Sequence, residues 1–222
     1  RQMCIRDRGL VEALRNNGHS PYTAVLDLID NCIDAGAENI DLFIKPPSTK
    51  NNNQSQFILA DDGCGMDENT LCRALTLGDH KNTDDDLGRF GVGMKTSGTT
   101  IGSDFYLLSR SMNGPLVKGI FDPEEIINSG KWEVKAGETT DKNDIAEFSE
   151  YVPSGCGTVV VINDLTKHHK HASLSQFGSK LNESIGETFR GFLIPKSSII
   201  NKKARSKLTI KINGEMVYGL DT

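Results

Sequence analysis

Three polar residues at helical spacing are the first in the chain whose types suggest chemistry. Asp27, Asn31 and Asp34 stand at i, i+4 and i+7, so on a helix they form one stripe. Asp and Asn are poor helix formers, and the stripe contains no Lys or Arg to neutralise its carboxylates. Oxygen ligands without a protein cation suggest a metal ion or a phosphate-bound metal. A solvated helix face is the alternative, and the stripe alone leaves both interpretations open.

An Asp-x-Gly-x-Gly segment follows a short apolar run. Residues 57–60 predict a buried strand, and Asp61, Gly63 and Gly65 come after it. The glycines let the backbone turn sharply and let a flat ring approach closely. An aspartate at the end of a buried strand can accept a hydrogen bond from an exocyclic amine, such as that of adenine. Asp and Gly are also common turn residues, so a strand-ending turn is the alternative.

A glycine-rich segment, Gly88-x-x-Gly91-x-Gly93, opens a predicted helix. Bare backbone N–H groups at a helix N-terminus bind anions, and Lys95 adds a positive charge in the first turn. The dinucleotide-binding fingerprint does not fit, because an acidic polar loop at 79–86 precedes the glycines instead of a strand. The Walker-type phosphate loop does not fit either, since no Gly-Lys-Ser/Thr follows.

Predicted helices and strands position these segments. Ser20 as N-cap, Pro21 at the first helical position and Gly36 past the end predict a helix that carries the polar stripe. Other helices are predicted at 10–16, from Asp67 to Gly78, after the glycine-rich segment and at 175–193. Strands are predicted at 40–45, 57–60, 105–109, 116–121, 157–162 and 208–212, with a weaker one at 132–135. Residues 137–154 predict a loop, and Asn213-Gly214 predicts a hairpin turn.

The composition excludes several classes of protein. The 222 residues suffice for one large domain or two small ones, and the net charge of −5 gives no global basic field. Five Cys without a CxxC pair predict reduced, mostly structural thiols in a cytoplasmic protein. The sequence contains no run of 18 apolar residues, so no membrane span is predicted. Residues 1–8 resemble a non-native leader. The histidines at 168, 169 and 171 are interrupted by Lys170 and predict a solvated loop.

In this order, the segments together resemble the GHKL ATPase superfamily of DNA gyrase B, the large heat-shock chaperone, histidine kinases and MutL. The resemblance runs from residue 10 to about residue 213 and includes the Gly157-Thr158 strand. The segments at 30–37, 91–97, 104–105 and 189–193 look most like bacterial MORC-type ATP-binding domains. The chaperone shares the glycine-rich segment closely and remains the alternative.

The resemblance implies a role for each matching residue. Asn31 matches the magnesium ligand, Asp27 the general base, and Asp61 the aspartate that reads adenine. Thr158 matches the threonine that supports the adenine, and Lys81 lies where relatives place a lid lysine on the phosphates. The other implied nucleotide contacts are Asp34, Gly63, Gly65, Met66, Gly88, Arg89, Phe90, Gly91, Val92, Gly93, Met94 and Lys95.

The resemblance also implies a fold and a function. The expected fold is an α/β (α+β) two-layer sandwich of the Bergerat type: a mixed, mostly antiparallel sheet, helices on one face and an ATP lid. The expected ATP-binding domain spans 9–205, and 206–222 form a strand and hairpin leading toward a further domain. The implied activity is magnesium-dependent binding and slow hydrolysis of ATP, driving lid closure and homodimerisation. DNA or a client protein would bind through further domains.

One residue departs from the family pattern. Most hydrolysing members carry Glu where this chain has Asp27, and Asp is one methylene shorter. A general base must reach the attacking water at hydrogen-bond distance, so the departure weakens the expectation of hydrolysis more than that of binding. A nucleotide-gated interaction module without significant turnover is therefore the alternative function.

Overall fold

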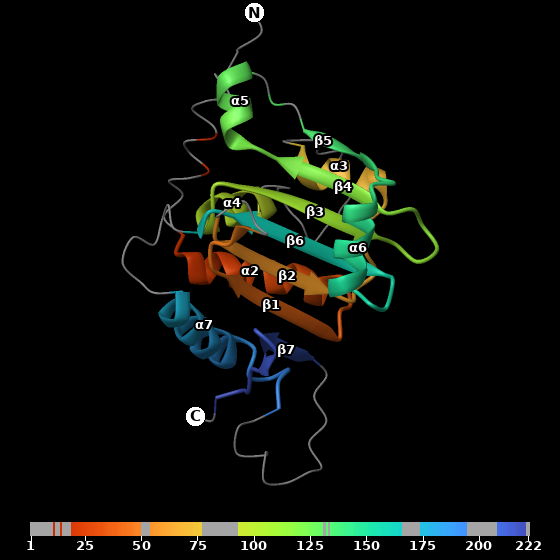
Figure 1. Cartoon of the computed structure of the whole chain (residues 1–222). Coiled ribbons are helices and arrows are strands. Elements are labelled where there is room, and N and C mark those ends of the chain that lie inside the picture. The colour runs from red at the N-terminus through yellow and green to blue at the C-terminus, as the bar shows by residue number, and fades with distance from the viewer. Residues whose placement is uncertain are drawn as a thin grey trace, which may run out of the picture.

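The protein is described here by a computed structural model, which places residues 11, 14, 19–49, 54–76, 93–130, 132, 134–165, 174–194 and 208–220. Eight strands form one sheet in the order β5-β4-β3-β6-β2-β1-β7-β8 (Figure 1). The strands are β1 Asn39–Lys45, β2 Gln56–Asp61, β3 Asp104–Arg110, β4 Val117–Phe121, β5 Lys135–Glu138, β6 Gly157–Asn163, β7 Thr209–Ile212 and β8 Glu215–Met216. The helices whose bounds lie within the described residues are α2 Pro21–Asp34, α3 Glu68–Leu75, α4 Gly93–Ile101, α5 Pro123–Ser129, α6 Lys142–Tyr151 and α7 Leu174–Thr188.

The β-branched strand β6 lies in the interior of the sheet, as its composition predicts. It pairs antiparallel with β2 on one side and with β3 on the other. These registers place Thr158 opposite both Asp61 and Ser109. Among the pairs that the structure describes, β1 with β7 is parallel and the others are antiparallel. The predicted mixed, mostly antiparallel sheet is confirmed.

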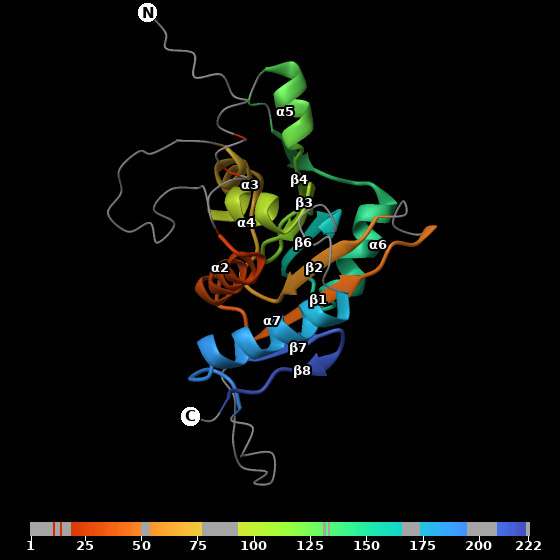
Figure 2. The ribbon, with the colours of Figure 1, turned by 90° about the vertical axis from the view of Figure 1, so that its left-hand side faces the viewer.

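Helices cover the sheet on both faces. The larger core joins one face of the sheet to the apolar sides of α2, α3, α5 and α7. The smaller core lies on the other face, where Phe148 of α6 and Val152 after it pack on Ile58, Leu108 and Val161. Figure 2 shows α6 on the opposite side of the sheet from α2, α3 and α4. The fold class is therefore as predicted, but the expectation of helices on one face fails for α6.

The helix that carries the polar stripe begins and ends where its signals predict. The Ser20 hydroxyl accepts a hydrogen bond from the Thr23 N–H at 3.1 Å, and Pro21 occupies the first turn. Gly36 follows the helix with φ of +76°, the left-handed conformation that favours glycine. The apolar side of α2 is buried, so its polar side is the one left toward the surface.

Three segments differ from the predictions. The loop predicted at 137–154 contains α6, whose N-cap Asp141 accepts a hydrogen bond from the Asn143 N–H. Phe148 is fully buried, and its packing on the sheet stabilises a helix whose sequence is otherwise mostly polar. The weak strand predicted at 132–135 is displaced to β5, and helix α5 was not predicted.

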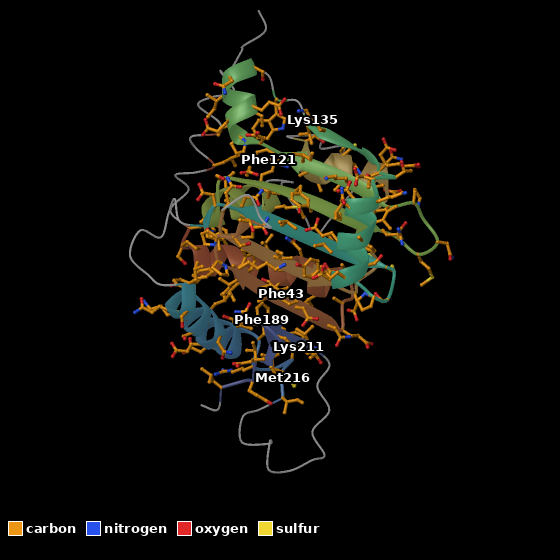
Figure 3. All side chains as sticks on the ribbon, in the orientation of Figure 1. Phe43, Phe121, Lys135, Phe189, Lys211 and Met216 are labelled. Atoms are coloured by element: carbon orange, nitrogen blue, oxygen red, sulfur yellow. The ribbon has the colours of Figure 1, made fainter. Side chains whose placement is uncertain are left out.

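The edge strands of the sheet are β5, which carries Lys135, and β8, which carries Met216 (Figure 3). Lys211 lies on β7, next to β8. The predicted hairpin turn is confirmed, because Asn213 and Gly214 have φ of 51° and 86° between β7 and β8. Within the described parts of the chain, no helix has the length and apolar character to cross a membrane.

Candidate functional site

Asp61 ends β2 as a buried carboxyl group with only 6% of its surface exposed. Burial raises its pKa to about 6, although hydrogen bonds from the Gly63 N–H and the Cys32 thiol favour the ionised form. The Gly63 N–H donates to Oδ1 at 2.9 Å. A carboxyl group that titrates near neutrality at the end of a strand is costly to bury, and such groups concentrate at functional sites.

The two glycines after Asp61 are required by close backbone contacts. A Cβ on Gly65 would lie 2.0 Å from the Arg110 carbonyl oxygen, and Gly65 has φ of +64°. A Cβ on Gly63 would lie 2.9 Å from both the Ala35 Cβ and Asp61 Oδ1. The loop is thus fixed between the end of α2 and the end of β3. The Cys64 N–H adds a hydrogen bond to the Ala35 carbonyl at 2.9 Å.

Replacing Gly65 by Ala is expected to destabilise the fold by about 3 kcal/mol or more, because backbone atoms cannot make room for the methyl group. Gly36→Ala is the matched control, since Gly36 has a similar φ of +76° and open space around its Cβ position. That control should cost only about 1 kcal/mol of backbone strain. Urea unfolding of the two variants compares the costs, and equal losses would show that the Arg110 contact is unimportant.

A buried hydroxyl network connects β3 and β6 with the loop that follows Asp61. The Ser109 hydroxyl accepts from the Met66 N–H at 2.8 Å and donates to the Gly157 carbonyl at 3.0 Å. The Thr158 and Ser109 hydroxyls are 2.9 Å apart. We call Asp61, Gly63, Gly65, Met66 and Thr158 the base site, because the resemblance implies that this end of the site contacts the base of a nucleotide, which stays a prediction. The structure brings these predicted residues together, and it adds Ser109, which sequence reasoning missed because only the strand register places it beside Thr158.

The stripe residues lie on the surface side of α2. Asn31 and Asp34 are exposed, and the Asp27 side chain is 42% exposed. Asp30 lies on the same helix, close enough to the stripe to feel its charges. Partial burial and the nearby carboxylates of Asp27 and Asp34 raise the pKa of Asp30. His19 Nδ1 lies 3.8 Å from Asp27 Oδ2. The three stripe residues and Asp30 all supply oxygen atoms, the ligand type that magnesium prefers.

The donor set also indicates how a magnesium ion would be held. No group of three His, Cys, Asp or Glu side chains suited to a metal ion occurs among the residues that the structure describes. Magnesium keeps several waters and is usually held by one or two protein oxygens together with substrate phosphates. The stripe fits that manner of binding, with Asn31 as the matching amide, and does not fit an all-protein cage.

Lys95 is buried on α4 beside the end of α3. Its side chain is fully buried, and Nζ donates to the carbonyl oxygens of Ala74 at 2.8 Å and Thr76 at 2.9 Å. The ammonium thus caps the carboxyl end of α3, where carbonyl groups lack helical partners. Burial lowers the pKa of Lys95 to about 8. In this structure the Lys95 ammonium group binds the end of α3, and its contact with a phosphate stays a prediction.

The remaining predicted residues are only partly described. Gly93 is exposed at the start of α4, Met94 is half-buried against the larger core, and α4 packs beside α2. Helices α2 and α4 therefore lie side by side, with Gly93 as the first described residue of α4. Lys81, Gly88, Arg89, Phe90, Gly91 and Val92 lie outside the described residues.

Comparison with known proteins agrees with this arrangement. Residues 19–158 match a family profile described as histidine kinase-, DNA gyrase B- and HSP90-like ATPase. The chain is 34% identical over 97 residues to ATPase MORC2B of Mus musculus, covering 41% of this chain and 9% of that protein. Identity to MORC family CW-type zinc finger protein 1 of Homo sapiens is 36% over 95 residues, covering 40% and 9%. Identity to Protein MICRORCHIDIA 2 of Arabidopsis thaliana is 32% over 96 residues, covering 42% and 15%. The chain spans at most 15% of the length of these three relatives.

Proposed function

The chain belongs to the histidine kinase-, DNA gyrase B- and HSP90-like ATPase family, and from that premise we propose that it binds ATP with magnesium and hydrolyses it slowly. The observation that best supports this proposal is Asp61, a buried acceptor held by a backbone N–H beside two obligatory glycines. In its ionised form it accepts a hydrogen bond from the exocyclic amine of adenine. Thr158, held by Ser109, supports the same edge of the base.

The stripe on α2 is proposed to serve the phosphate end of the nucleotide. Asn31 would hold magnesium through its amide oxygen, together with the phosphates. The metal, when bound, neutralises phosphate charge. Asp27 is the proposed general base: it lies one turn before Asn31, and its 42% exposed side chain is accessible to water. A carboxylate at this position orients the water for in-line attack on the γ-phosphate and accepts its proton.

Slow turnover follows from the length of the Asp27 side chain. With one methylene fewer than Glu, its carboxylate lies farther from water positioned by the phosphates, and proton transfer requires hydrogen-bond distance. The expected role of hydrolysis is that of a switch: nucleotide binding closes a lid over the phosphates and promotes homodimerisation of the whole protein. DNA or a client protein would be bound by other parts of that protein. The alternative is a nucleotide-gated interaction module, which the shortened base favours.

Single-turnover hydrolysis of radiolabelled ATP separates these two functions. Asp27→Ala should slow the chemical step by about a hundredfold or more, while ATP affinity changes little, because only the general base is lost. Asp27→Glu should raise the rate, since it restores the longer side chain. If wild type and Asp27→Ala hydrolyse ATP at the same rate, Asp27 is not the base and the interaction module is the better description.

A further inference from the structure

Two cysteines meet beside the base site although they are 92 residues apart in the chain. Cys64 lies between Gly63 and Gly65 and is exposed, whereas Cys156 directly precedes the Gly157-Thr158 strand and is half-exposed. The Cys156 thiol donates to the Gly63 carbonyl at 3.3 Å and to the Cys64 carbonyl at 3.4 Å. Both are free thiols, and neither has a part in the proposed ATP chemistry.

The Cys156 sulfur lies close to the backbone of Cys64. A carbonyl oxygen lies about 2.4 Å from its own Cα, so the Cys156 sulfur lies at most about 6 Å from the Cys64 Cα. A disulfide needs the two Cα atoms about 4.4–6.8 Å apart, and its formation requires the exposed Cys64 side chain to turn toward the Cys156 sulfur. Cys156 follows Gly155, whose φ of +79° forms the turn that brings the Cys156 thiol onto the Cys64 loop. Gly157 after it is fixed, since its Cβ position is 2.0 Å from the Asp61 carbonyl oxygen.

The other described cysteines lack these features. Cys32 is 4% exposed, and burial raises its pKa well above the usual value, which makes it unreactive. Cys72 lies on α3 and is half-exposed, and the described contacts of the Cys156 thiol are with Gly63 and Cys64 instead. Oxidation is therefore expected to select Cys64, the exposed thiol, with Cys156 as its neighbour.

We propose that Cys64 and Cys156 form a redox pair that hydrogen peroxide converts into an intramolecular disulfide beside the base site. The Cys64 sulfur, as thiolate, attacks one peroxide oxygen; the O–O bond breaks, and a sulfenic acid and water form after proton transfer. The Cys156 sulfur then attacks the sulfenic sulfur, forming the S–S bond and releasing a second water. Two thiols lose two electrons and two protons, and the peroxide is reduced to two waters.

The bond would change the base site because Cys64 lies within its glycine loop. Forming it turns the Cys64 side chain from solvent toward Cys156, and the neighbouring Gly63 N–H is the group that holds Asp61. Gly65 cannot follow this rotation freely, because the Arg110 backbone abuts it. The oxidised chain is therefore expected to bind adenine nucleotides more weakly, and this consequence rests on the proposed function.

Peptide mapping after mild oxidation tests the pair. The reduced protein, in a Cys4→Ser background, is treated with a small excess of hydrogen peroxide and digested without reductant. Wild type at both sites should give a linked peptide containing Cys64 and Cys156, which dithiothreitol separates. Cys156→Ser should instead leave Cys64 as a sulfenic acid that dimedone traps, and Cys72→Ser should behave as wild type. Absence of the linked peptide, or equal dimedone labelling of Cys64 with and without Cys156, would overturn the proposal.

ATP affinity of the same samples tests the consequence separately. Oxidation should weaken ATP binding by about fivefold or more, dithiothreitol should restore it, and Cys156→Ser should abolish this reversible change. If the disulfide forms and the affinity is unchanged, the coupling to the nucleotide is wrong. If the reduced protein does not bind ATP at all, the proposed function fails, while peptide mapping still decides the thiol chemistry.

Discussion

Asp61→Asn is expected to weaken the binding of ATP and of adenosine by about tenfold to a hundredfold, with no loss of stability. The Gly63 N–H holds one oxygen of this side chain, so an Asn would keep its oxygen there and turn its NH₂ group toward the base. The exocyclic amine of adenine would then face a donor instead of an acceptor, and an unpaired buried donor costs about 1–3 kcal/mol. Calorimetric titration measures the loss.

The folded state of this variant should be at least as stable as wild type. Burial already disfavours the charge on Asp61, so a neutral side chain of the same shape removes a cost. Asp41→Asn, on the neighbouring strand β1, is the matched control and should leave nucleotide binding unchanged. Retained affinity in a folded Asp61→Asn protein would remove Asp61 from the base site.

The pH dependence of adenosine binding gives the same prediction a second measurement. Burial raises the pKa of Asp61 to about 6 in the free chain, and the amine of adenine donates to the ionised form. Binding therefore lowers this pKa, so affinity should be constant above pH 6 and fall as the pH drops below 6. Adenosine is used because it carries no titrating phosphate. Asp61→Asn should lose this dependence, and an affinity that rises toward acid pH would contradict it.

Asn31→Ala is expected to remove most of the gain that magnesium gives to ATP binding, about tenfold or more. The amide oxygen of Asn31 is the proposed protein ligand, and its exposed place on α2 means that little packing is lost with it. Calorimetry with ATP is performed in magnesium and in EDTA. Wild type and variant should differ in the first buffer and agree in the second.

Two controls make this result specific to the metal. Adenosine should bind Asn31→Ala as tightly as wild type, because the base site is intact. Asn182→Ala makes the same substitution on α7 and should change neither measurement. An unchanged magnesium dependence in Asn31→Ala would show that the stripe does not hold the metal.

Local signals predicted the parts of the fold that depend on neighbouring residues. The caps of α2 depend on Ser20, Pro21 and Gly36, which act within one turn of the helix end. The β-branched run of β6 suits only an extended, buried strand, and the structure places it between β2 and β3. The sharp turn after Asp61 was likewise predicted from residues within the turn, Gly63 and Gly65.

Features that depend on distant contacts were not predicted. Helix α6 is polar over most of its length, and Phe148 becomes a core residue only because a second face of the sheet is available to bury it. In the sequence, Ser109 is only a small polar residue of a predicted strand. The strand register places it opposite Thr158. The charge of Lys95 was assigned to phosphate, whereas the end of α3 lies close enough to bind it. In each case, partners more than 15 residues away in the chain take part, and a local pattern does not include them.

Titration of the chain with ATP and with GTP, in magnesium at pH 8, tests the central claim most directly. The claim is that a buried carboxylate at the end of β2 reads the base of a nucleotide. Guanine carries a carbonyl group where adenine carries its amine, so it would place an acceptor against the ionised Asp61. The account predicts saturable binding of one ATP per chain and an affinity for GTP at least about a hundredfold lower. Equal affinities for ATP and GTP, or no saturable ATP binding by the folded chain, would contradict it.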